Sequence, residues 1–121
     1  MKKIAVILHA EPGTHDSLGR ALHALLYTRE LKDAGNTVQL VFDGGGTRWV
    51  QEMADPEHKL NPLYKSLLAD DLIAGVCDFC IGAFEGDKEL VRSEGIKLVD
   101  ENQGHPSLAK LVAEDYQIIT L

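Results

Sequence analysis

This chain of 121 residues has no long apolar run and only two cysteines, and both features narrow its class. No apolar stretch approaches the ~20 residues that a membrane-spanning helix needs, so we expect no membrane partner. The start of the chain, Met1 to His9, is basic and then briefly apolar, without a small-residue cleavage site. We interpret it as a first strand and expect a cytoplasmic protein. Two cysteines in a cytosolic chain indicate redox, catalytic or metal chemistry more often than a structural disulfide.

Clustered positive charge is also missing. The net charge is −7, and the lysines and arginines are scattered instead of forming a basic stripe. Nucleic-acid binding needs clustered cations to neutralise phosphates, so we expect no nucleic-acid partner. There is no internal repeat, low-complexity tract or interdomain linker. With 45% hydrophobic and 26% charged residues, residues 1–121 are predicted to form a single globular domain.

Apolar runs alternate with stretches of helical periodicity along the whole chain. Five runs are predicted to be strands, near residues 3–9, 37–42, 74–79, 96–99 and 117–120. Helix starts are expected where capping residues or proline precede a periodic stretch, at Asp16 or Ser17, Asn61-Pro62, Asp87 and Pro106. Strand–helix alternation predicts an α/β fold with a mainly parallel five-stranded sheet and helices on both faces.

The two cysteines, Cys77 and Cys80, fall where the third strand is expected to run into a helix. Ligands and chemistry collect at the carboxyl ends of parallel strands. A helix beginning at Cys80 would stabilise the thiolate, which is the reactive form of cysteine. This favours Cys80 as the more reactive thiol and Cys77 as the more buried one. The alternative is that both are small packing residues at the junction.

The same sheet edge carries glycines and acidic residues. Glycine-rich turns can cradle phosphate, but neither common phosphate-binding glycine motif is present. The acidic side chains expected nearby would repel an anionic cofactor. We therefore favour glycines that allow a tight turn and close backbone approach over a nucleotide or flavin site, which stays the alternative, and we expect no cofactor. The candidate ligand-binding residues at this edge are His9, Asp43, Gly44, Gly45 and Asp78.

Metal binding is a further option for the cysteines. Cys77 and Cys80 with two histidines would supply a zinc ligand set, and His9 and His105 are expected near strand ends. No two histidines have the close spacing typical of zinc ligands, however. The sequence therefore favours surface or loop roles for the histidines and predicts no metal site.

Three stretches resemble the DsrE/DsrF-like family. They are the apolar first strand with its loop and long helix, residues 41–50, and residues 76–84. That family includes the sulfur-relay subunits of dissimilatory sulfur oxidation and tRNA thiolation. The resemblance implies a three-layer α/β/α fold and a homo-oligomer, usually a trimer or hexamer. It also implies that a cysteine after the third strand carries sulfur as a persulfide, and Cys80 matches that position best.

Three functions remain open from the sequence. The chain resembles a sulfur carrier that exchanges sulfur with donor and acceptor proteins. The C-x-x-C spacing also fits a thiol–disulfide redox or sensing protein. The third option is a non-catalytic oligomeric protein that binds a small ligand. For the oligomer, we expect an apolar interface at Trp49, Leu60, Leu63 and Tyr64.

Overall fold

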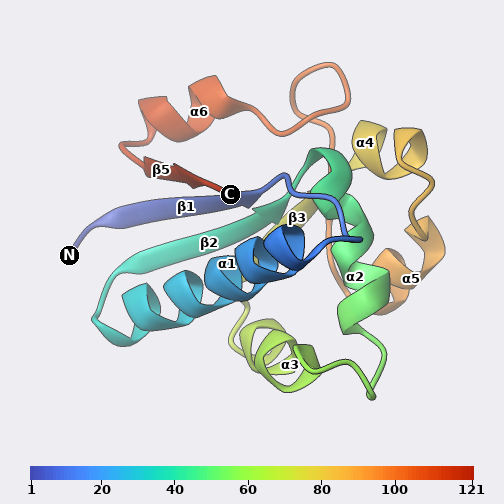
Figure 1. Ribbon diagram of the computed structural model, residues 1–121. Coiled ribbons are helices and arrows are strands. Elements are labelled where there is room, and N and C mark those ends of the chain that lie inside the picture. Colours follow the sequence, from blue (N-terminus) through green and yellow to red (C-terminus); the bar gives the residue numbers. More distant parts are fainter.

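The computed structural model describes residues 1–121 as one α/β domain built on a five-stranded sheet (Figure 1). Every strand pairing is parallel, and the strand order is β4-β3-β2-β1-β5. The strands are β1 (Lys3–Leu8), β2 (Thr37–Phe42), β3 (Ile73–Cys77), β4 (Leu98–Val99) and β5 (Gln117–Thr120). The five predicted strands are all present, and the parallel α/β fold expected from the alternation is confirmed.

The helices vary greatly in length. The longest, α1, packs on β1 and β2, and the rest span two or three turns at most. They are α1 (His15–Asp33), the 3₁₀ helix η1 (Gly44–Arg48), α2 (Trp49–Met53), α3 (Asn61–Ala69), α4 (Asp78–Ala83), α5 (Lys88–Ser93) and α6 (Leu108–Ala113). None of these helices is long and apolar enough to cross a bilayer.

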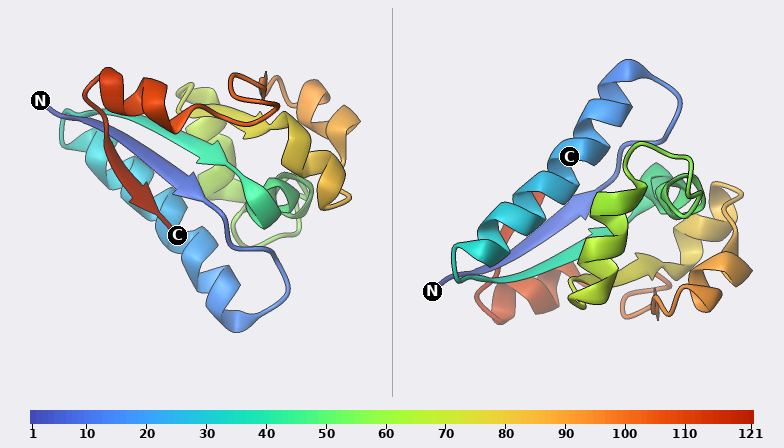
Figure 2. Two further views of the ribbon diagram at one scale, coloured as in Figure 1. Left: turned by 90° about the horizontal axis from the view of Figure 1, so that it is seen from above. Right: turned by 90° about the horizontal axis from the view of Figure 1, so that it is seen from below.

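The strand order decides which face each helix covers. From β1 to β4 the chain moves steadily across the sheet, and right-handed crossovers then place the connecting helices on one face. From β4 it returns to the opposite edge to form β5 beside β1, which places α6 on the other face (Figure 2). The connections leaving β3 and β4 therefore go to opposite faces. In parallel sheets, such a divergence leaves a crevice at the strand ends where ligands bind.

Two apolar clusters hold the three layers together. The larger contains 21 buried residues from the sheet and from α1, α2, α3, α4 and α5. The smaller contains four, in which Leu111 of α6 packs on Ala5, Ile7 and Val41. The continuous apolar sequence of β1 follows from this arrangement, since both faces of that strand are covered.

Two helix starts differ from the sequence expectation. Thr14 caps α1, where Asp16 or Ser17 was expected. The Thr14 hydroxyl accepts a hydrogen bond from the Ser17 N–H, and the Ser17 hydroxyl accepts one from the Thr14 N–H. Asn61 is the first residue of α3 and not its cap, because its side-chain amide donates to the Met53 carbonyl at 2.8 Å. The predicted cap at Asp87 is present and accepts from the Leu90 N–H.

The boundary between β3 and α4 also lies earlier than expected. The strand ends at Cys77, and the helix begins at Asp78 instead of Cys80. Cys77 occupies the N-cap position because its sulfur accepts the Cys80 backbone N–H at 3.3 Å. A thiol rarely fills this role, so the usual capping residues gave no signal here.

The expected apolar interface is wrong in its residues. Trp49, Leu60 and Tyr64 are at most 5% exposed and belong to the larger core cluster, against which Leu63 packs. Trp49, Leu60 and Tyr64 are thus buried within the same chain and are not available to cover a second copy, whereas Leu63 is partly buried.

Candidate functional site

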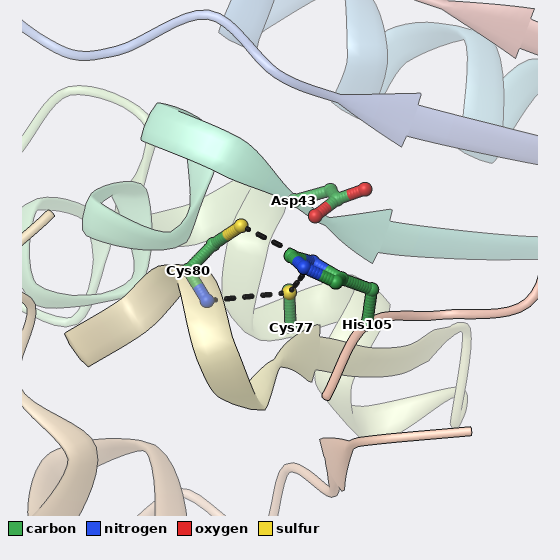
Figure 3. A group of neighbouring side chains, drawn as sticks. All are labelled: Asp43, Cys77, Cys80 and His105. Carbon is green, nitrogen blue, oxygen red and sulfur yellow. Dashed lines mark hydrogen bonds between the residues drawn. The ribbon is translucent and has the colours of Figure 1, made fainter. Parts of the chain in front are cut away.

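Four potential ligand side chains converge at the carboxyl end of the sheet: Asp43, Cys77, Cys80 and His105 (Figure 3). Their donor atoms all lie within 4.8 Å of one another. Asp43 follows β2, Cys77 is the last residue of β3, Cys80 lies in α4, and His105 lies in the loop between β4 and α6. We call these four residues the thiol cluster. It occupies the crevice formed where the connections from β3 and β4 diverge.

Cys77 is the innermost member. It is fully buried, and its sulfur lies 3.2 Å from His105 Nδ1. The same sulfur accepts the Cys80 backbone N–H and lies 3.6 Å from the Gly104 carbonyl, to which the thiol can donate. The sulfur is thus held by contacts from both the helix start and the loop after β4.

Cys80 lies one turn further along, in α4. Its side chain is 9% exposed, whereas Cys77 is 0% exposed, and both thiols are free. The Cys80 sulfur lies 3.6 Å from the same His105 Nδ1. One imidazole nitrogen therefore faces two thiols, and it can accept a proton from either in the neutral tautomer that leaves Nδ1 unprotonated.

The loop that carries His105 is fixed at several points. Asn102 and His105 exchange two backbone hydrogen bonds, and the Phe79 N–H donates to the Gly104 carbonyl at 2.9 Å. The Phe79 ring packs on the imidazole with centroids 4.9 Å apart. Glu101 accepts from the Ser107 N–H and from Lys110, which joins the loop to α6. These contacts place His105 over the start of α4.

Asp43 is the acidic wall of the cluster. Its carboxylate accepts the Gly44 N–H at 2.9 Å and lies 3.4 Å from His9 Nε2. Contact with His9, and then with Cys77 and the Gly44 N–H, lowers the pKa of Asp43 to about 2 against the opposing effect of its burial. The side chain is therefore a carboxylate at neutral pH.

Burial acts in the opposite direction on Cys77. Desolvation, with the Cys80 thiol and the Asp43 carboxylate nearby, raises the pKa of Cys77 to about 12, although the Cys80 N–H opposes the shift. Cys77 is therefore a protonated thiol at neutral pH. The helix argument used for the sequence does not decide between the cysteines, because Cys77 caps α4 and Cys80 lies within it.

The other candidate residues lie around the cluster in different roles. His9 and Gly44 contact Asp43. Asp78, in contrast, pairs with Lys88 at 3.1 Å and is not a member of the cluster. The close backbone approach expected of the glycines is present at Gly45, where an added Cβ would lie 2.6 Å from the Cβ of Glu11.

A small cavity borders the cluster through Asp43. It has a volume of about 140 Å³ and lies between the ends of β1 and β2 and helix α6. Ligand pockets for drug-sized molecules are typically ~300–1,000 Å³. This cavity therefore suits a small species better than a nucleotide. Its lining is Ile7, His9, Asp43, Pro106, Leu108, Leu111 and Thr120.

His105 is the site residue that the sequence does not single out. Its position predicts a place near a strand end, but no second histidine has the close spacing typical of zinc ligands. Its partners are 25 and 28 positions away in the chain, and a short strand, two helices and a loop intervene. The usable signal was position alone, since His105 and the cysteines follow adjacent strands.

The fold and this site define a small α/β protein with two buried thiols at the strand ends. Comparison with known proteins identifies its family: the DsrE/DsrF-like family matches residues 2–121, and the chain belongs to it. The uncharacterized protein MJ0733 of Methanocaldococcus jannaschii is 30% identical over 100 residues, covering 83% of this chain and 78% of that protein. The crystal structure of the ychN protein from E. coli has the same fold, with a TM-score of 0.56, 16% identity and full coverage of both chains.

Proposed function

We propose that this protein is a sulfur carrier that holds a sulfane sulfur on Cys80. The observation behind this proposal is the placement of the Cys80 sulfur, 3.6 Å from His105 Nδ1 and less deeply buried than its neighbour. A base beside a thiol is the arrangement that activates a cysteine nucleophile, and Cys80 is the less buried of the two thiols. Membership of a family that includes sulfur-relay proteins supports the same chemistry.

Loading begins with proton transfer from the Cys80 thiol to His105 Nδ1. The thiolate then attacks the outer sulfur of a donor persulfide, forming a new sulfur–sulfur bond at Cys80. The bond between the two donor sulfurs breaks, and the donor leaves as a thiolate that takes up a proton. In unloading, an acceptor thiolate attacks the outer sulfur of the Cys80 persulfide. The sulfur–sulfur bond at Cys80 breaks, and Cys80 is released as a thiolate that takes up a proton. No net oxidation or reduction occurs in either direction.

Cys77 has a different role in this scheme. It is fully buried, and its raised pKa keeps it protonated, so it does not compete for the donor. Its sulfur nevertheless lies within 4.8 Å of the Cys80 sulfur. If no acceptor arrives, Cys77 can attack Cys80, forming an intramolecular disulfide and releasing hydrosulfide. The partners of the carrier are thus a sulfur donor protein and an acceptor protein.

Intact-mass measurement after incubation with a small sulfane donor tests this proposal directly. The Cys77→Ser variant, which cannot form the intramolecular disulfide, should gain the mass of one sulfur, which a thiol reductant removes. The Cys80→Ser variant should gain none, and the wild type should carry either the added sulfur or the disulfide that replaces it. No added sulfur on the folded Cys77→Ser variant, or equal loading of Cys80→Ser, would overturn the assignment.

A thiol–disulfide protein is the second candidate, favoured by the two free sulfurs within 4.8 Å of one another. In this function Cys77 and Cys80 cycle between dithiol and disulfide, and either serine substitution abolishes the cycle. A thiol titration across a series of redox buffers separates the two candidates. A pair that forms no intramolecular disulfide at any potential rules out the redox function and leaves the carrier.

A further inference from the structure

We infer that the thiol cluster is a binding site for a divalent zinc ion, with Asp43, Cys77, Cys80 and His105 as four ligands. Two sulfurs, one imidazole nitrogen and one carboxylate oxygen form a donor set that zinc accepts. They come from three separate segments and are the only four-residue group of this kind in the chain. This inference does not rest on the sulfur-carrier proposal.

The distances fit a tetrahedral ion. With Zn–S near 2.3 Å and Zn–N near 2.0–2.1 Å, tetrahedral angles place sulfur and nitrogen about 3.6 Å apart. The two sulfur–nitrogen distances are 3.2 Å for Cys77 and 3.6 Å for Cys80, both to Nδ1 of His105. All remaining donor pairs lie within 4.8 Å, so small side-chain rotations bring them onto one centre.

The contacts around the four donors are those that orient metal ligands. The Cys80 N–H points at the Cys77 sulfur, a hydrogen bond that stabilises a metal-bound thiolate. Asp43 is held by the Gly44 N–H and by His9. The position of His105 is set by its paired backbone bonds with Asn102.

Charge also favours a cation here. Asp43 is a carboxylate, and no lysine or arginine pairs with it. Each thiol would release its proton to solvent as its sulfur bonds to the metal, so the filled site carries two thiolates and one carboxylate around the dication. A site with four protein ligands has no open position, which is typical of a structural zinc site. Zinc would join β2, the β3–α4 junction and the loop before α6.

Occupancy has one consequence for chemistry at the same residues. A thiolate that shares an electron pair with zinc is a weaker nucleophile than a free thiolate, so the metal-bound protein should accept a sulfane sulfur more slowly than the metal-free protein. This consequence, unlike the site itself, rests on the proposed carrier function. Zinc would then slow the loading of the carrier.

Cobalt titration of the reduced, metal-free wild type tests the site without any variant. One equivalent of Co²⁺ should give intense visible bands typical of tetrahedral coordination and a thiolate-to-cobalt band in the near ultraviolet. One equivalent of Zn²⁺ should remove both. Weak bands typical of six-coordinate cobalt, or no thiolate band, would overturn the inference.

Matched variants identify the ligands. Loss of a residue that only hydrogen-bonds a metal ligand typically lowers metal affinity by ~10–100-fold. The changes Asp43→Asn and His105→Gln remove ligands, so each should lower zinc affinity by more than that. Asp78→Asn is the control for the acid, because Asp78 lies beside Cys77 in sequence but pairs with Lys88. His23→Gln is the control for the histidine, because His23 lies exposed on α1. Unchanged affinity in both ligand variants, or equal losses in the controls, would contradict the site.

The two proposals can fail separately. Persulfide loading is measured in the presence of a metal chelator and reports only on the carrier. The cobalt spectrum is recorded without a sulfur donor and reports only on the metal site.

Discussion

At the scale of single residues, His105 is the group on which the chemistry of Cys80 depends. The change His105→Gln should slow persulfide loading of metal-free protein at neutral pH, because Nδ1 no longer takes the Cys80 proton. A positioned base typically contributes ~100–10,000-fold to the rate of such a step, so we expect a loss of at least about tenfold. Loading rates measured by mass against pH check this.

The pH profile gives the mechanism a readout that damage to the fold would not produce. The gap between wild type and His105→Gln should close as the pH rises, since solvent then ionises the thiol without help. His23→Gln should load like the wild type at every pH. A constant gap across the whole range would argue against a base at residue 105.

Gly46 marks the tightest backbone contact near the site. An added Cβ would lie 1.9 Å from the Leu8 carbonyl oxygen, so Gly46→Ala forces β1 and η1 apart. We expect it to lower the free energy of unfolding by about 2 kcal/mol or more. Gly19 in α1 is the matched control: it has open space around its Cβ position, so Gly19→Ala should be neutral or stabilising by up to ~1 kcal/mol. Urea unfolding of both variants tests the pair, and similar stabilities would contradict the close approach.

The residues of the site were only partly predictable. Cys77, Cys80, Asp43 and His9 could be selected because each follows a recognisable strand, and parallel strand ends share one edge. The inward position of His105 could not be predicted, since it depends on a loop held by Phe79 and Asn102. Asp78 shows the opposite error: it is adjacent to Cys77 in sequence, but the first turn of α4 directs it toward Lys88.

At the scale of elements, the loop between β4 and α6 is secured to α6 by Glu101. Its carboxylate accepts hydrogen bonds from Lys110 Nζ at 2.7 Å and from the Ser107 N–H. These contacts lower the pKa of Glu101, and the contact with Lys110 has the largest effect. Because the pKa of Glu101 is lower in the folded state, its ionisation stabilises the fold at pH values above its unfolded-state pKa, which is near 4.3. This stabilisation is lost as the pH falls through the folded-state pKa.

The change Glu101→Gln should therefore cost less than about 1 kcal/mol at neutral pH, because the pair is largely exposed and screened. The difference from wild type should shrink as the solution is acidified below the unfolded-state pKa. Unfolding curves at neutral and acidic pH measure it. A penalty that grows on acidification would contradict the ion pair.

The strands could be predicted from the sequence, but some element boundaries could not. The runs predicted near residues 3–9, 37–42 and 117–120 agree with the observed strands to within one residue. The β3–α4 boundary was misplaced because the cap is a sulfur, and the short β4, Leu98–Val99, is two residues where four were expected. α6 begins at Leu108 after a Ser107 cap, two residues beyond the proline that signalled it.

At the scale of the whole molecule, we expect a homo-oligomer, a trimer or hexamer. The apolar residues expected to form the interface lie in the core, but Phe79, Leu108 and Val112 are each more than half exposed. Phe79 lies on α4, beside the thiol cluster, and Leu108 and Val112 lie on α6, which covers the other face of the sheet from α1 (Figure 1). Association through these surfaces would remove apolar area from water.

Sedimentation velocity at micromolar concentration tests the assembly. The wild type should sediment as an oligomer, and the double change Leu108→Lys with Val112→Lys should shift it toward monomer. Leu26→Lys on α1 is the control, since Leu26 is also exposed but lies elsewhere. A monomeric wild type would contradict the oligomer.

The central claim is that Cys80, and not Cys77, is the reactive thiol of the cluster. Alkylation rates of the two single-cysteine proteins, metal-free and at neutral pH, test it most directly. Cys77→Ser leaves the 9% exposed Cys80, and Cys80→Ser leaves Cys77, which is fully buried with its pKa raised to about 12. We predict that Cys80 reacts at least about tenfold faster, because it is the less buried thiol and because the raised pKa of Cys77 leaves little of that thiol as the reactive thiolate. If Cys77 reacts as fast as Cys80 or faster, the assignment of roles to the two cysteines is wrong.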